Sequence, residues 1–239
     1  MSNTITIFKK ELRSYFNSPI AYIFVVVFLV TVNWLFFRSF FLVGQVSMRS
    51  FFSLLPWIFL IVLSALAMRL WAEERKEGSI ELLLTLPITD SAPVVGKYLA
   101  ALGFLIITLL LTVPTAITVA SLGNIDNGEI IGGYLGALLL GGAILALGSF
   151  ISSLTRNQIV SFLLTVVFSF IAIIISQDYV LAPVGGIVAE TINFVSLSSH
   201  YNVLISGLVS AGDIAYFLGW IFFFLFLTIK VLQSRYYKG

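Results

Sequence analysis

The sequence predicts an all-α, polytopic membrane protein, and four observations support that fold class. Of its 239 residues, 59% are hydrophobic and 10% are charged, whereas soluble domains carry roughly 25% charged residues. The mean hydropathy is +1.08. The apolar residues fall in unbroken runs of about 18 to 28, long enough to cross a hydrocarbon core of roughly 30 Å as helices. The alternation of apolar and polar residues that barrel strands require is missing.

Six runs are long enough to be transmembrane helices, and they make residues 1–239 a single membrane domain. Because backbone groups cannot stay unpaired in lipid, each run is expected to be helical. The first run exceeds the apolar part of a signal peptide and has no cleavage pattern after it, so we expect it to remain as the first span. The expected spans are Ile20 to Leu42, Phe51 to Trp71, Ala92 to Val119, Ile130 to Ser152, Ile159 to Ser176 and Asp213 to Leu232.

Six spans place both termini on one side of the membrane, and the basic residues indicate which side. Cytoplasmic loops are enriched in Lys and Arg. Only Arg38 and Arg49 fall on the side opposite the termini. We therefore expect both termini to be cytoplasmic. Their side carries Lys9, Lys10, Arg13, Arg69, Arg75, Lys76, Lys97, Arg156, Lys230, Arg235 and Lys238.

Residues 1–19 are predicted to form an amphipathic helix ahead of the first span. Such a helix lies in the membrane interface, with its apolar face toward the acyl chains. A solvated tail that only follows the positive-inside rule is the alternative. The apolar face carries Phe8, Leu12, Tyr15 and Phe16, and the basic residues Lys9, Lys10 and Arg13 lie largely outside it.

The cytoplasmic connection at 72–91 has an order of residue types that predicts a short, separate helix. Residues 73–77 extend the second span as a charged helix. Gly78 can end that helix, because glycine adopts the left-handed conformation at little cost. Ser79 can then cap a helix over residues 80–86, which Pro87 stops.

This short helix carries an apolar patch with two open interpretations. Leu82, Leu83 and Leu86 share one side, with Glu77 and Glu81 beside them. Exposed apolar clusters rimmed by charge are typical of protein contacts, and a helix in a groove is a recurrent mode of docking. The residues fit immersion in the bilayer interface equally well.

Two further segments leave alternatives open. The external connection at 177–212 is too apolar for a solvated loop, so re-entrant helices and a compact external cap are both compatible with it. Glycines recur in the fourth span at intervals that favour close helix packing, either within the subunit or at a dimer seam. They are Gly132, Gly133, Gly136, Gly141, Gly142 and Gly148.

Several classes of function are disfavoured by what the sequence lacks. It has no cysteine and no G-x-x-x-x-G-K-[ST], H-E-x-x-H or G-x-S-x-G motif, so we expect no ATP, metal, cofactor or catalytic site in this chain and no nucleic-acid partner. The lone histidine, His200, is predicted to be external. Lys97, Asp213 and Lys230 lie near span ends, where snorkelling explains them and an ion relay is not required. An ion-coupled carrier and a membrane anchor without transport remain alternatives.

Five segments resemble one family. EERKEGSIELLLTLPIT followed by Gly96-Lys97-Tyr98 is similar to the cytoplasmic coupling region of ABC-2 type permeases, the membrane subunits of ATP-binding-cassette transporters. Other segments resemble the gliding-motility-associated branch and its bacterial relatives. The family often has an Arg-Asp pair before the last span, where this chain has Gly212-Asp213. The other segments are Ser18-Pro19, residues 55–58 (LPWI), residues 123–126 (GNID) and residues 153–160 (SLTRNQIV).

The resemblance implies a mechanism and a set of partners. Two permease copies, identical or related, would pair in a bacterial inner membrane, and each would receive a cytoplasmic ATPase that binds ATP and Mg. An auxiliary membrane subunit with a large extracytoplasmic domain is a further expected type of partner, and membrane lipid would contact the first helix through Phe8, Lys9, Lys10, Leu12, Arg13 and Phe16. The ATPase interface would comprise Glu73, Glu74, Glu77, Gly78, Ser79, Glu81, Leu82, Leu83, Leu86, Pro87 and Arg156.

Overall fold

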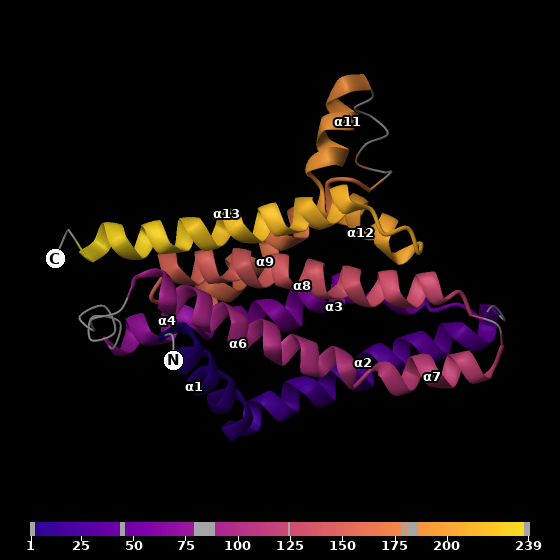
Figure 1. The fold of residues 1–239 in the computed structure, drawn as a ribbon, viewed down its shortest axis with the longest axis horizontal. Coiled ribbons are helices and arrows are strands. Elements are labelled where there is room, and N and C mark those ends of the chain that lie inside the picture. The colour runs from indigo at the N-terminus through magenta and orange to yellow at the C-terminus, as the bar shows by residue number, and fades with distance from the viewer. Residues whose placement is uncertain are drawn as a thin grey trace.

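The computed structural model describes residues 3–43, 46–78, 89–123, 125–177, 180 and 186–236. Every regular element within those ranges is a helix. The helices form an elongated bundle, and the start of the first helix lies toward the same end as the close of the last (Figure 1). The all-α prediction is therefore confirmed for the described part of the chain.

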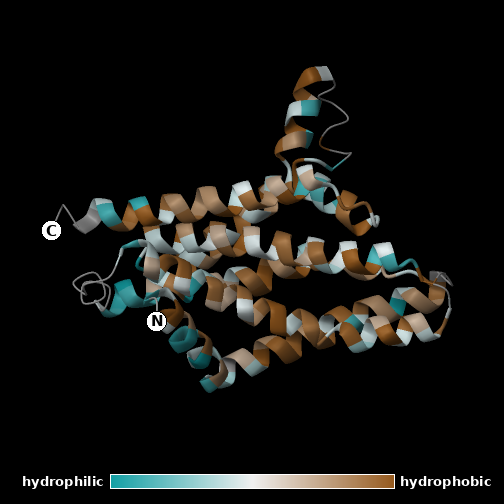
Figure 2. Ribbon diagram, in the orientation of Figure 1, coloured by the Kyte–Doolittle hydropathy of each residue, from teal (hydrophilic) through white to brown (hydrophobic). Residues whose placement is uncertain are grey.

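Five helical stretches among the described residues are long and apolar enough to cross a membrane. Brown, apolar residues dominate their lengths, and teal residues gather at the ends of the bundle (Figure 2). The stretches are α2 (Pro19–Val43), α3 with α4 (Arg49–Ala67 and Arg69–Glu77), α6 with α7 (Ser91–Leu110 and Val113–Ser121), α8 (Asn127–Leu154) and α13 (Ala211–Tyr236).

The sixth expected span corresponds to α9 (Gln158–Ile174). This helix is apolar but has 17 residues, which is about 26 Å at 1.5 Å per residue and falls short of a hydrocarbon core of roughly 30 Å. The count of six spans therefore stays a prediction.

Helix α8 is the centre of the bundle and packs against α3, α6, α9, α12 and α13. Its glycines allow this packing, because a methyl group on Gly133 would collide with the ring of Phe52 and one on Gly148 would collide with Ala67. The six glycines of the fourth span all lie against residues of the same chain. The structure thus favours packing within the subunit over the dimer seam.

The third expected span is broken next to a proline. Helix α6 ends at Leu110, and α7 begins at Val113 with Pro114 in its first turn. Proline has no backbone N–H and its ring clashes with the carbonyl group four residues earlier, so a continuous helix is disfavoured there.

The external connection contains two helices with different surroundings, α11 (Gly186–Val195) and α12 (Leu197–Ile205). Helix α12 lies in the bundle, and the Tyr201 hydroxyl donates a hydrogen bond to the carbonyl oxygen of Phe52 at 2.6 Å. Helix α11 has no buried residue and stands out from the bundle (Figure 1). In this region α12 therefore packs in the bundle, whereas α11 projects from it.

Candidate functional site: a charged junction of α1, α4 and α6

Helix α1 (Asn3–Asn17) packs along α6. Gly96 of α6 lies against Ile7, and Gly103 lies against Phe8 and Leu12. The rings of Tyr15 and Phe16 contact Phe104 at centroid distances of 5.6 and 5.8 Å. The apolar face therefore packs against α6, where two glycines leave a shallow groove, and its residues stay half-buried. The basic residues Lys9, Lys10 and Arg13 are exposed, and their contact with lipid remains a prediction.

Helix α4 continues α3 after an interruption at Met68, and a serine from α8 fills that interruption. The backbone N–H groups of Trp71 and Ala72 each donate to Ser152 Oγ at 3.0 Å. The Ser152 hydroxyl donates to the carbonyl oxygen of Met68, also at 3.0 Å. The indole Nε1–H of Trp71 donates to Ser149 Oγ at 3.0 Å. Hydrogen bonds from Ser149 and Ser152 of α8 thus fix the position of the first turn of α4.

Lys97 of α6 is the charged centre of the junction. Its Nζ lies 2.8 Å from Glu74 Oε1 and 3.5 Å from Glu11 Oε1, and it sits 5.3 Å from the centroid of the Trp71 ring. Lys97 is only 4% exposed. The expectation that it snorkels is wrong, because two carboxylates and an aromatic face replace water around the ammonium group.

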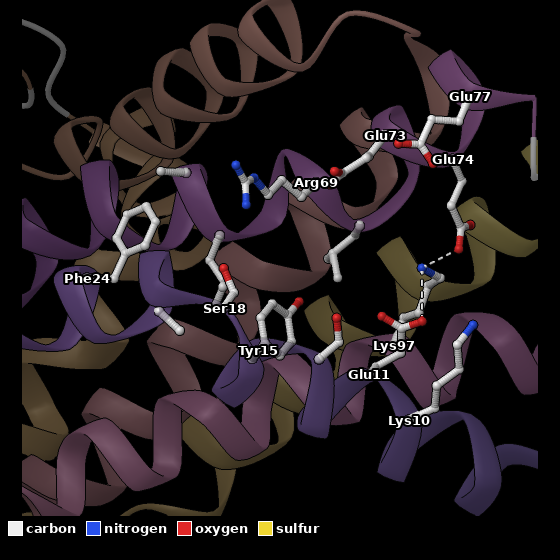
Figure 3. A pocket seen from close by; sticks show the side chains of 15 residues that line it. Lys10, Glu11, Tyr15, Ser18, Phe24, Arg69, Glu73, Glu74, Glu77 and Lys97 are labelled. Atoms are coloured by element: carbon white, nitrogen blue, oxygen red, sulfur yellow. Dashed lines mark ion pairs between the residues drawn. The ribbon is translucent and has the colours of Figure 1, made fainter.

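A cavity of about 440 Å³ opens beside this ion cluster, between α1, the start of α2, the end of α3 and α4. Side chains from α1 and α4 converge on it (Figure 3). Burial raises the pKa of Tyr15 above its ordinary value. The lining residues are Lys10, Glu11, Ser14, Tyr15, Ser18, Ala21, Phe24, Ala65, Leu66, Arg69, Leu70, Glu73, Glu74, Glu77 and Lys97.

The expected ATPase interface is described only in part. Gly78 ends α4 in the left-handed conformation, with φ of 73°, as the sequence predicts. Glu73, Glu74 and Glu77 line the cavity, and Arg156 is exposed in the connection between α8 and α9. Outside the described residues lie Ser79, Glu81, Leu82, Leu83, Leu86 and Pro87.

A second polar cluster joins α11 and α12 to α13. His200 Nδ1 lies 2.5 Å from Asp213 Oδ1, and His200 Nε2 lies 2.9 Å from the carbonyl oxygen of Phe194. The imidazole also stacks on the ring of Tyr216, with centroids 4.0 Å apart. Asp213 is 8% exposed, so snorkelling is wrong here too. Asp213, which lies where the family often has an Arg-Asp pair, is paired here with His200 of α12.

Sequence reasoning missed Lys97, Arg69, Trp71, Ser149 and Ser152 as parts of one site. Only Lys97 carried a usable signal, because a lysine at the sixth residue of an expected span is costly unless it is paired. The serines gave none, since a hydroxyl can return its hydrogen bond to its own helix. Their role depends on the register between α4 and α8.

An all-helical bundle with five spanning stretches among its described residues, and a charged junction where α1, α4 and α6 meet, defines a multi-pass membrane protein. The chain belongs to the ABC-2 family of transporter proteins, whose family model matches residues 5–236. No curated protein gives a significant match to the chain. Members of this family are membrane components that normally work with a separate ATPase subunit.

Proposed function

We propose that this chain is the membrane-spanning permease subunit of an ABC transporter in the bacterial cytoplasmic membrane, with both termini cytoplasmic. Two copies, or this chain and a related permease, form the membrane part, and a cytoplasmic ATPase that holds ATP and Mg docks on each. ATP hydrolysis then drives substrate export or mechanical work. We also propose that the chain is related to the gliding-motility-associated branch of the family, which its sequence resembles.

The family match over residues 5–236 carries the proposal, and the geometry of α4 supports it. Helix α4 extends the second span beyond its apolar part and ends at Gly78 in open space, since a methyl group on this glycine would meet no described atom within 4 Å. The predicted docking helix over residues 80–86 follows two residues later in the sequence. A rigid, charged helix between a span and the docking segment can transmit movement of an ATPase to the membrane.

Co-purification of the ATPase with its permease tests the docking step. Gly78→Val strains a left-handed residue, and Leu82→Asp with Leu83→Asp places charge on the apolar patch. We expect both variants to insert normally and to lose the ATPase. Gly186→Val is the matched control, because Gly186 is also left-handed, with φ of 66°, and also has open space around it. Unchanged co-purification of both test variants would count against the docking role.

ATP hydrolysis separates a transporter from a membrane anchor that recruits an ATPase. The complex in nanodiscs is expected to hydrolyse ATP, and cargo should change that rate, because linkage makes substrate and nucleotide states affect each other. An ATPase rate that no cargo alters, in a complex that forms normally, favours the anchor. An ion-coupled carrier predicts uptake driven by an ion gradient without any ATPase.

A further inference from the structure

The cavity beside Lys97 crosses the boundary between the apolar and the polar part of the bundle. Its apolar wall comes from the first turns of α2, at Ala21 and Phe24, and from the last turns of α3, at Ala65 and Leu66. Its polar wall comes from α1 and α4, the two helices that leave the spans. A pocket with this division suits an amphiphile whose chains stay in the bilayer and whose headgroup enters the protein.

In the described part of the chain, some charged residues of the polar wall form ion pairs with each other, and others do not. Lys97 is neutralised by Glu11 and Glu74. Four other charged residues line the cavity without an ion pair among the described residues: two cations and two carboxylates. The guanidinium Nε of one of the cations is buried and has no hydrogen-bond partner there. The four residues are Lys10, Arg69, Glu73 and Glu77.

The cavity lining therefore presents both positive and negative side chains to a ligand. Figure 3 shows Arg69 and Glu73 of α4 on the opposite side of the cavity from Tyr15 and Ser18. An arginine and the hydroxyl groups that face it suit a phosphate, because guanidinium and phosphate form charge-assisted hydrogen bonds. Two carboxylates suit an ammonium group that can donate up to three hydrogen bonds.

We propose that this cavity binds the headgroup of a phospholipid that carries a primary amine, drawn from the bilayer leaflet that faces α1 and α4. The phosphate lies at Arg69, on the side that faces Tyr15 and Ser18, the ammonium group lies at Glu73 and Glu77, and the acyl chains leave past Phe24. The volume of about 440 Å³ falls within the usual range for pockets that hold small molecules, roughly 300–1,000 Å³.

Other ligands match the cavity less well. A purely anionic headgroup would meet the carboxylates of Glu73 and Glu77 without a positive charge to offset them. A trimethylammonium headgroup has no N–H to donate. A metal ion is disfavoured, because no group of three or more His, Asp or Glu side chains in the described ranges is placed to ligate one. A soluble headgroup would leave the apolar wall uncovered.

Photo-crosslinking of the purified chain tests the proposal. The protein is reconstituted in phosphatidylcholine vesicles that contain a trace of phosphatidylethanolamine with a photoreactive acyl chain, and labelled peptides are mapped by mass spectrometry. We expect labels near Phe24 and Leu66. Unlabelled phosphatidylethanolamine should compete, phosphatidylcholine and phosphatidylglycerol should compete poorly, and soluble glycerophosphoethanolamine should not compete at equal concentration.

Two charge-neutral variants locate the headgroup contacts. Arg69→Gln and Glu73→Gln should each reduce labelling about tenfold, the equivalent of one hydrogen bond to a charged group. Arg49→Gln and Glu190→Gln are the matched controls, because both residues lie outside the cavity lining, and they should label like the natural chain. If Arg69→Gln does not give a monodisperse protein, Ala65→Phe, which fills the apolar wall, replaces it.

Three results would overturn the proposal. Labels spread over the lipid-facing residues of the spans would mean only bulk lipid contact. Equal competition by all three phospholipids would remove the role of the amine. Labels lost on addition of the ATPase subunit, with no effect of Arg69→Gln or Glu73→Gln without it, would assign the cavity to a protein contact. None of these results depends on transport activity, so the proposed function is tested separately.

Discussion

The hydroxyl of Ser152 on α8 donates to the carbonyl oxygen of Met68 at 3.0 Å, where α3 gives way to α4. The same hydroxyl oxygen accepts the backbone N–H groups of Trp71 and Ala72. One serine therefore supplies three hydrogen bonds to a helix junction inside an apolar bundle. It ties the helix that leads into the coupling segment to the central helix of the fold.

Ser152→Ala is expected to destabilise the chain by about 1–3 kcal/mol, because buried backbone groups at the junction lose their partner. Thermal unfolding in detergent measures the change. Ser153→Ala is the control, since Ser153 donates to the carbonyl oxygen of Phe150 in its own helix, and it should unfold close to the natural temperature. Equal shifts in the two variants would mean that the junction has no special part in stability.

Lys97→Met is expected to cost roughly 2–4 kcal/mol, somewhat less than for a fully buried pair, because a fifth of each partner carboxylate stays exposed. The physical cause is the charge left on Glu11 and Glu74. Chemical denaturation of the reconstituted protein gives the value. Glu11→Gln and Glu74→Gln added to Lys97→Met should recover part of the loss, and a loss that stays complete would show that packing and not charge is responsible.

Gly132→Ala tests the close approach of α8 and α12. A methyl group there would collide with the carbonyl oxygen of Leu204, and overpacking of this kind costs about 1–3 kcal/mol. The change also removes the helix penalty of glycine, worth about 0.8–1 kcal/mol, so we expect a net loss of stability. Gly219→Ala meets no described atom within 4 Å and should be neutral or stabilising in the same melting assay.

His200→Phe is expected to loosen the external helices while it keeps the aromatic stack on Tyr216. Both ring nitrogens of His200 contact acceptors, one on α11 and one on α13, and phenylalanine can donate to neither. Hydrogen exchange over residues 186–205 should speed up about tenfold for each 1.4 kcal/mol lost. Ser206→Ala is the control, because the Ser206 hydroxyl donates to the nearby carbonyl oxygen of Val203. Unchanged exchange in His200→Phe would show that α11 is not held by this histidine.

Much of the fold was predictable from local sequence. The spans over residues 20–42, 51–71, 130–152 and 213–232 follow from apolar runs that no other structure can accommodate in lipid, and the break before Pro114 follows from proline chemistry. The end of α4 was also predictable, because Gly78 is followed directly by residues that can cap a new helix. These features depend on neighbours in the chain.

The candidate site was predictable only in outline. Glu73, Glu74 and Glu77 could be placed at the cytoplasmic end of the second span, but their surroundings could not. Lys97 was interpreted as a snorkelling residue, since its partner Glu11 lies in another helix and is distant in sequence. The packing of α1 on α6 could not be foreseen, because the two glycines of α6 that receive α1 are not marked as a groove by the sequence.

The sequence by itself determined that this protein is helical and spans a membrane, because hydropathy and backbone hydrogen bonding act within each segment. Only the tertiary structure decided which charges meet, which serine closes the break at Met68, and where a cavity with both signs of charge opens. Those features arise when helices far apart in the chain pack in one register, and a shift of a single turn in α6 or α8 would separate them.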